Sequence, residues 1–149
     1  HQVDQSTTRF KAGAKLHELG ACNNCHFYGT EFPKQGAQTW APNMALTKER
    51  LQPAWVIEWM RDPQNIMPGT KMPAPFLPDK ELLQLPGAAS DWGKYVLEVG
   101  GDKEAMLAGL RDYVYSIKGK TDITPEIQNY FKKNGYDFEI EEDEEDEDW

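Results

Sequence analysis

The chain has 149 residues, 39% of them hydrophobic, and a formal net charge of -9 at pH 7. This length fits one domain of ordinary size with extensions. No apolar run reaches the roughly 20 residues that a membrane-spanning helix needs, so we expect a soluble protein. Residues 141–148 account for eight of the negative charges, and the nearly neutral remainder has no basic stripe of the kind that nucleic-acid-binding proteins carry.

The first predicted helix leads directly into the two cysteines of the chain. Phe10, Ala14, His17 and Ala21 recur near helical spacing. His17 has no partner motif, so we expect it to be a surface or packing residue. The chain begins at His1 without an initiator Met, and we expect that it was trimmed or has lost a targeting peptide.

The stretch GACNNCHFYG, residues 20–29, holds both cysteines and one of the three histidines. A redox-active C-x-x-C normally follows a strand in a βαβ unit, whereas the residues before Cys22 favour a helix. A structural zinc site needs four ligands, usually from a second Cys or His pair at short spacing. A plain disulfide leaves His26 unexplained. The interpretation that remains is C-x-x-C-H as the attachment site of a c-type haem.

The spacing of this motif suits that chemistry. Residues i and i+3 of a helical turn point the same way, so the thiols of Cys22 and Cys25 can both bond to one haem edge. His26 then lies under the iron as the proximal ligand. A single motif of this kind is a hypothesis that its sequence context must support.

The next predicted helix begins at Pro53 and is stopped by Pro63. Its apolar side chains fall on one side: Trp55, Val56, Trp59 and Met60. The two tryptophans at i and i+4 are candidates either for lining a haem pocket or for simple core packing.

A loop rich in Pro and Gly follows, RDPQNIMPGTKMPAPF at residues 61–76, and it holds Met67 and Met72. A Met thioether is a second axial ligand of haem iron that raises the reduction potential. Because the prolines restrict the backbone, such a loop can hold a ligand at little entropic cost.

Further helices are predicted in the second half of the chain. A weaker helix over residues 91–99 is interrupted by Gly93. A closing helix reaches Lys118 in its last turn, with Gly119 just past it. Its apolar stripe consists of Met106, Leu110, Tyr113, Val114 and Ile117.

The C-terminal extension has three predicted parts. Residues 124–126 (TPE) favour a helix start and residues 134–135 (NG) a stop. Residues 136–141 alternate apolar and acidic side chains, which is typical of an extended strand with one apolar face. The acidic run at 141–148 is either a solvated tail or a docking segment.

Together these segments resemble class I cytochrome c, a family of small electron carriers. FKAGAKLHELGACNNCH is similar to the family's first helix and haem-attachment motif, APNMALTKERL to its proximal loop, PGTKMP to its distal loop and LRDYVYSIKG to its closing helix. The resemblance implies an all-α fold around one covalently bound haem c, with a domain at 1–119 and an extension at 120–149. An insertion at about 77–101 and the extension depart from the family pattern.

The resemblance also implies the roles of individual residues. Cys22 and Cys25 would hold the haem, His26 and Met72 would ligate the iron, and the carbonyl of Pro42 would accept a hydrogen bond from the axial imidazole. The other residues assigned to the haem pocket are Trp55, Trp59, Thr70 and Tyr113.

The implied function is electron transfer between Fe(III) and Fe(II) in the periplasm or another space outside the cytoplasm. Filled axial positions exclude substrate, so we expect no enzymatic activity. The expected partners are redox proteins, with a basic surface that complements the acidic tail, or neighbouring subunits of an assembly. We expect no nucleic-acid partner and no membrane span. The alternatives are a fixed subunit of a respiratory assembly or filament, and a haem enzyme or gas-binding module with an open distal position.

Overall fold

The computed structural model describes residues 1–122 and 124–135. These residues form helices joined by loops and contain no β-strand, which confirms the predicted all-α class. The α-helices are α1 (Thr8–Leu19), α2 (Thr47–Arg50), α3 (Pro53–Arg61), α4 (Pro63–Ile66), α5 (Lys80–Leu83), α6 (Ala88–Trp92), α7 (Lys94–Val99), α8 (Lys103–Ser116) and α9 (Thr124–Lys133). Short 3-10 turns are η1 (Cys22–Asn24), η2 (Ala37–Thr39) and η3 (Met44–Leu46). None of the described helices could cross a bilayer.

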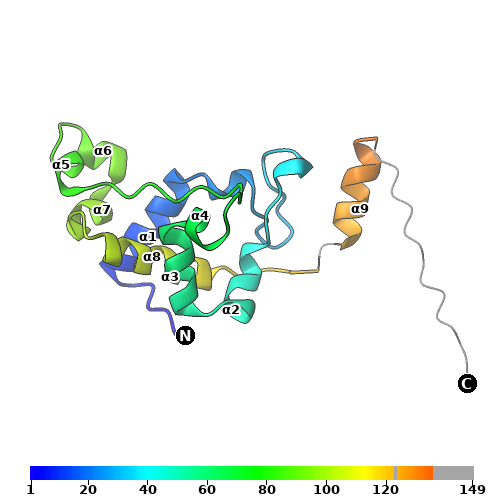
Figure 1. Cartoon of the computed structure of the whole chain (residues 1–149), viewed down its shortest axis with the longest axis horizontal. Coiled ribbons are helices and arrows are strands. Elements are labelled where there is room, and N and C mark those ends of the chain that lie inside the picture. Colours follow the sequence, from blue (N-terminus) through cyan, green and yellow to red (C-terminus); the bar gives the residue numbers. More distant parts are fainter. Residues whose placement is uncertain (123, 136–149) are drawn as a thin grey trace, which may run out of the picture.

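Helices α1 and α8 pack directly on one another (Figure 1). The side chain of Thr7 caps α1 and that of Asp102 caps α8. At the crossing the two backbones touch, because a Cβ placed on Gly13 would lie 2.1 Å from the carbonyl carbon of Gly109. Only glycine at both positions permits this approach.

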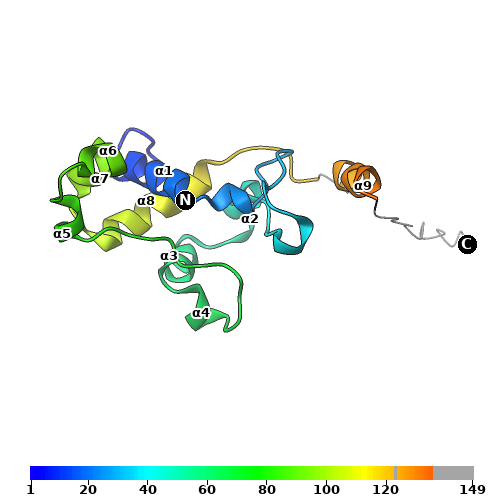
Figure 2. The same cartoon turned by 90° about the horizontal axis from the view of Figure 1, so that it is seen from above.

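The core forms around this helix pair. Its most deeply buried side chains come from α1, α3, α7 and α8: Ala12, Leu16, Val56, Val96, Met106, Leu107, Leu110 and Val114. The burial of Val96 shows that the insertion contributes to the core, since α7 packs against α1. Figures 1 and 2 place the insertion helices α5–α7 at one end of the α1–α8 pair and α9 at the other.

Most predicted helices are present, and one of them begins earlier than predicted. α3 has Pro53 in its first turn and ends before Pro63, as predicted. The helix predicted over 91–99 is broken at Gly93, which has φ 80°, but its first half starts earlier, at Ala88. α9 agrees with the helix predicted in the extension. The predicted strand at 136–141 and the acidic tail at 141–148 lie outside the described residues.

The ends of α1 and α8 differ from the prediction. α1 stops at Leu19, and Ala21 takes a left-handed conformation (φ 51°) instead of continuing the helix. α8 stops at Ser116, whose hydroxyl donates to the carbonyl of Tyr113 at 2.6 Å, and Ile117 is extended. Lys118 and Gly119 therefore lie beyond the end of the helix.

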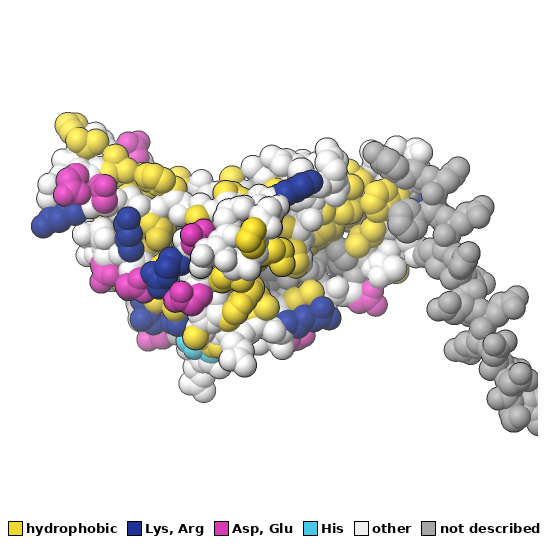
Figure 3. Space-filling view, in the orientation of Figure 1, with side chains coloured by type: hydrophobic (Ala, Val, Ile, Leu, Met, Phe, Trp, Pro, Cys, Tyr) yellow, Lys and Arg dark blue, Asp and Glu magenta, His cyan; other side chains and the backbone are white. Residues whose placement is uncertain are grey.

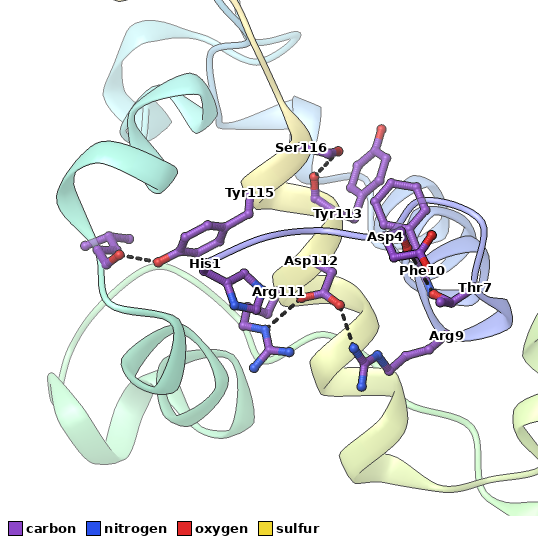
Figure 4. A network of polar contacts seen from close by, with 11 residues as sticks. His1, Asp4, Thr7, Arg9, Phe10, Arg111, Asp112, Tyr113, Tyr115 and Ser116 are labelled. Carbon is purple, nitrogen blue, oxygen red and sulfur yellow. Dashed lines mark hydrogen bonds and ion pairs between the residues drawn. The ribbon is translucent and has the colours of Figure 1, made fainter.

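A buried carboxylate ties the N-terminal segment to this helix pair. Asp112 of α8 is 2% exposed. Its oxygens accept hydrogen bonds from Arg111 Nε at 2.9 Å and Arg9 Nη2 at 3.0 Å, and lie 2.8 Å from His1 Nε2 (Figure 4). The ring of His1 also packs edge-on against Tyr115. One side chain thus joins α1, α8 and the first residue.

Replacing Asp112 by Asn should lower the free energy of unfolding by about 2 to 4 kcal/mol, because the shape is kept while Arg9 and Arg111 lose a buried anionic partner. Denaturant unfolding at pH 7 measures this. Glu104→Gln is the matched control, since it removes a carboxylate from the same helix whose ion pair with Arg61 is exposed. Equal losses in the two variants would contradict the role given to the buried network.

Candidate functional site

The two cysteines and His26 occupy one tight turn after α1. The backbone N–H groups of Cys25 and His26 both donate to the carbonyl of Cys22, at 3.2 and 3.0 Å. This is the single helical turn that the i, i+3 spacing predicts. Both cysteines are free and half-buried, and burial raises the pKa of the Cys22 thiol.

The imidazole of His26 is oriented by a backbone carbonyl. Its Nδ1 lies 2.6 Å from the oxygen of Pro42, the contact that the resemblance implied. Because a carbonyl only accepts, Nδ1 carries the proton and the lone pair is on Nε2. Burial lowers the pKa of His26, and the bond to Pro42 opposes this shift. The ring is therefore a neutral imidazole with one nitrogen available as a metal ligand.

The segment that carries Pro42 is tied to the motif by its backbone. The N–H of Ala41 donates to the carbonyl of Cys25 at 2.8 Å, and His26 and Ala41 form an isolated parallel bridge. We call Cys22, Cys25, His26 and Pro42 the motif half-site. Its geometry depends on the pairing of two separate chain segments, one at His26 and the other at Ala41.

Met72 is held by an indole from α3. Trp59 Nε1 donates to the sulfur of Met72 at 2.9 Å, and the Met72 N–H lies 3.4 Å from the hydroxyl of Thr70. The side chain of Gln64 braces the same loop, since it donates to the carbonyl of Thr70 and accepts from the Gly69 N–H at 3.1 Å. The loop thus presents a positioned thioether.

The other methionine of this loop has a different environment. Met67 is 57% exposed, whereas Met72 is half-buried and hydrogen bonded. The structure therefore distinguishes two residues that composition alone treats alike.

The tryptophans of α3 form a stacked pair, and Trp59 also packs against the edge of the core. Their ring centroids are 5.3 Å apart with an interplanar angle of 11°. Val56 and Met60 face the core, while Trp55 is 39% exposed. We call Trp55, Trp59, Thr70 and Met72 the Met72 half-site. Trp59 therefore contacts both the core and Met72, whereas Trp55 lies at the surface.

Tyr113 and His17 meet beside the motif. The Tyr113 ring lies 4.7 Å from that of His17 and 5.9 Å from that of Phe10. His17 is a packing residue, 6% exposed, and its Nε2 is hydrogen bonded to the hydroxyl of Tyr28. Its Nδ1 has no hydrogen-bond partner within residues 1–122 and 124–135. Burial, aided by nearby His26, lowers the pKa of His17 to about 4.

Two hollows lie near these residues. One, of about 250 Å³, is lined by His17, Glu18, Asn23, Tyr28, Glu31 and Tyr113. The other, of about 320 Å³, lies between the end of α1 and α6, beside Phe76 and Trp92. Neither cavity is lined by His26 or Met72. The two half-sites are therefore described by the hydrogen bonds that position these side chains, and not by a cavity. The described part of the chain has no group of three or more His, Cys, Asp and Glu side chains placed to hold a metal ion.

Comparisons of the chain with protein families, curated proteins and solved structures gave no match. The functional assignment below is therefore a proposal that rests on the residues, their geometry and the resemblance of the sequence motifs. Sequence reasoning missed the bond from Trp59 to Met72, the brace from Gln64 and the bond between His17 and Tyr28. No periodic signal points to such pairs, because each joins different elements.

Acidification should destabilise the protein through His17. Its pKa is lower in the folded chain (about 4) than its ordinary value of 6.5, so its contribution to stability is full above pH 6.5 and is lost as the pH falls toward 4. Between pH 7 and pH 4.5 the loss should be roughly 2 to 3 kcal/mol. His17→Phe keeps a ring against Tyr113 but cannot titrate. Urea unfolding at both pH values should show a smaller pH dependence for this variant, and an unchanged dependence would contradict the assignment.

Proposed function

We propose that the chain is a monohaem c-type cytochrome that transfers single electrons. Cys22 and Cys25 would attach the haem, and His26 and Met72 would ligate its iron. The observation that carries the proposal is the motif half-site: two free thiols in one turn, followed by an imidazole whose Nδ1 donates to Pro42 and whose Nε2 is free to ligate. Haem c, when bound, supplies an iron that changes between Fe(III) and Fe(II).

The donor set fits this group. Thiols at i and i+3 suit two thioether bonds on one edge, and a backbone acceptor on Nδ1 is the usual means of orienting a metal-ligating His. The Met72 thioether is a soft ligand that favours the ferrous state. The hydrogen bond from Trp59 keeps this sulfur in one orientation, which lowers the entropic cost of ligation.

The same residues support electron transfer over catalysis. If His26 and Met72 both ligated the iron, they would leave no ligand position for a substrate, which argues against a haem enzyme or gas-binding module. The loop of Met72 supplies no acidic or His side chain between Thr70 and Ala74 that could act as an acid or base. We therefore propose no enzymatic activity.

The partner and location follow from the resemblance and from the charge. Haem attachment through C-x-x-C-H in this family takes place outside the cytoplasm, so we place the protein in a periplasm or an equivalent oxidising space. Residues 141–148 are all acidic, while the rest of the chain is nearly neutral. A redox partner with a basic surface would complement them and associate faster at low salt.

The test of this proposal is haem c itself. The full chain, produced in a host that exports it and attaches haem, should show the pyridine haemochrome spectrum of a haem with two thioether bonds. Cys22→Ser and Cys25→Ser should each shift the spectrum to that of one thioether, and the double variant should lose haem on denaturation. A full chain purified without covalent haem from a host that matures another c-type cytochrome would contradict the proposal.

The axial ligand has its own test. Met72→Ala should lower the reduction potential and allow rapid carbon monoxide binding, because the thioether that favours the ferrous state is removed. Met67→Ala is the matched control, since Met67 lies in the same loop but is exposed. Carbon monoxide binding by the Met67 variant and not by the Met72 variant would reverse the assignment.

A further inference from the structure

The helix of the extension docks on the loop that follows the motif. The ring of Tyr130 on α9 stacks on that of Phe32, with 5.3 Å between ring centroids and an interplanar angle of 19°. Its centroid also lies 5.1 Å from that of Trp40. Phe131 lies 5.6 Å from Trp40. Beneath them Trp40 also contacts Phe27 at 4.9 Å. Figure 3 shows hydrophobic side chains gathered where α9 meets this loop.

The linker before α9 is attached to the same loop at a second point. The side-chain amide of Asn43, 8% exposed, donates to the carbonyl of Lys120 at 3.3 Å and to that of Gly29 at 3.0 Å. Its oxygen accepts from the N–H groups of Gly29 and Ala45, both at 3.0 Å. A Cβ placed on Gly119 would lie 2.8 Å from the Cα of Gly29, so the linker and the loop are in backbone contact.

Between these two points of attachment lie the residues that orient His26. Trp40 is held by α9 and Asn43 by the linker, and the two residues between them are Ala41 and Pro42. The Ala41 N–H binds the carbonyl of Cys25, and the Pro42 carbonyl accepts the proton of His26 Nδ1. The extension thus holds both ends of the segment that carries the acceptor.

We propose that the extension is a clamp that positions the Pro42 carbonyl against His26, with Trp40, Asn43 and Tyr130 as positioning residues. The contacts of the extension are observed in the structure, whereas their effect on His26 as an axial ligand rests on the proposed function. An acceptor on the far nitrogen of a metal-ligating imidazole fixes its tautomer and raises its basicity. A loosened Pro42 carbonyl would weaken this effect and make the reduction potential more positive.

The clamp depends on docking and not on the helix alone. A helix of 10 residues is marginal in isolation, and aromatic pairs contribute about 0.5 to 1.5 kcal/mol each beyond their buried area. Replacing docked rings by Ala raises the intrinsic helix propensity. A loss of docking in such a variant therefore arises from the missing rings.

The experiment compares the double variant Tyr130→Ala, Phe131→Ala with Asn129→Ala, which lies on the exposed side of the same helix. The readout is the exchange rate of the His26 Nδ1 proton, measured by NMR on the full chain, in the reduced state when haem is attached. We expect severalfold faster exchange in the double variant and an unchanged rate in the control. Circular dichroism checks that α1 and α8 stay folded in both.

Two further measurements keep the outcomes distinct. Deletion of residues 136–149, which keeps α9, should leave the exchange rate unchanged, and the double variant should have a more positive potential than the control. An unchanged exchange rate in the double variant, or equal acceleration in Asn129→Ala, overturns the clamp. Absence of covalent haem would overturn the proposed function and not the clamp, because proton exchange is measurable in either form.

Discussion

The contact on which the rest of the structure depends is the crossing of α1 and α8 at Gly13 and Gly109. With no side chain on either residue the two backbones meet, and the larger side chains around them interlock on both sides. The motif follows directly from the end of α1, and the extension follows from the end of α8. This one crossing therefore sets where the motif begins and where the extension leaves the domain.

The two half-sites are built by different means. In the motif half-site the turn at Cys22–His26 is local, and only the Pro42 acceptor comes from a later segment. In the Met72 half-site the contact that holds the sulfur joins different elements, because the indole is on α3 and the sulfur is on a loop. A local turn forms wherever its few residues allow, while a loop needs a partner elsewhere in the fold to hold one conformation.

The insertion and the extension are the two segments that depart from the pattern of the family that the chain resembles, and they differ in how they pack against the α1–α8 pair. The insertion joins the core through Val96, so its removal would expose part of α1. α9 has no buried residue and attaches through partly exposed aromatic rings to the loop beyond the motif. The first is part of the folded domain, and the second is an addition placed beside the candidate site.

The sequence by itself determined the features that depend on near neighbours: the helical class, the helix begun by Pro53, the break at Gly93, the helix at Thr124 and the single turn that carries Cys22, Cys25 and His26. Only the tertiary structure decided the end of α8 at Ser116, the burial of His17, the hydrogen bond from Trp59 to the sulfur of Met72, and the contact of Tyr130 with Trp40. The physical reason is that spacing and turn chemistry act over a few residues, whereas these outcomes depend on which distant side chains the helix crossing brings into contact.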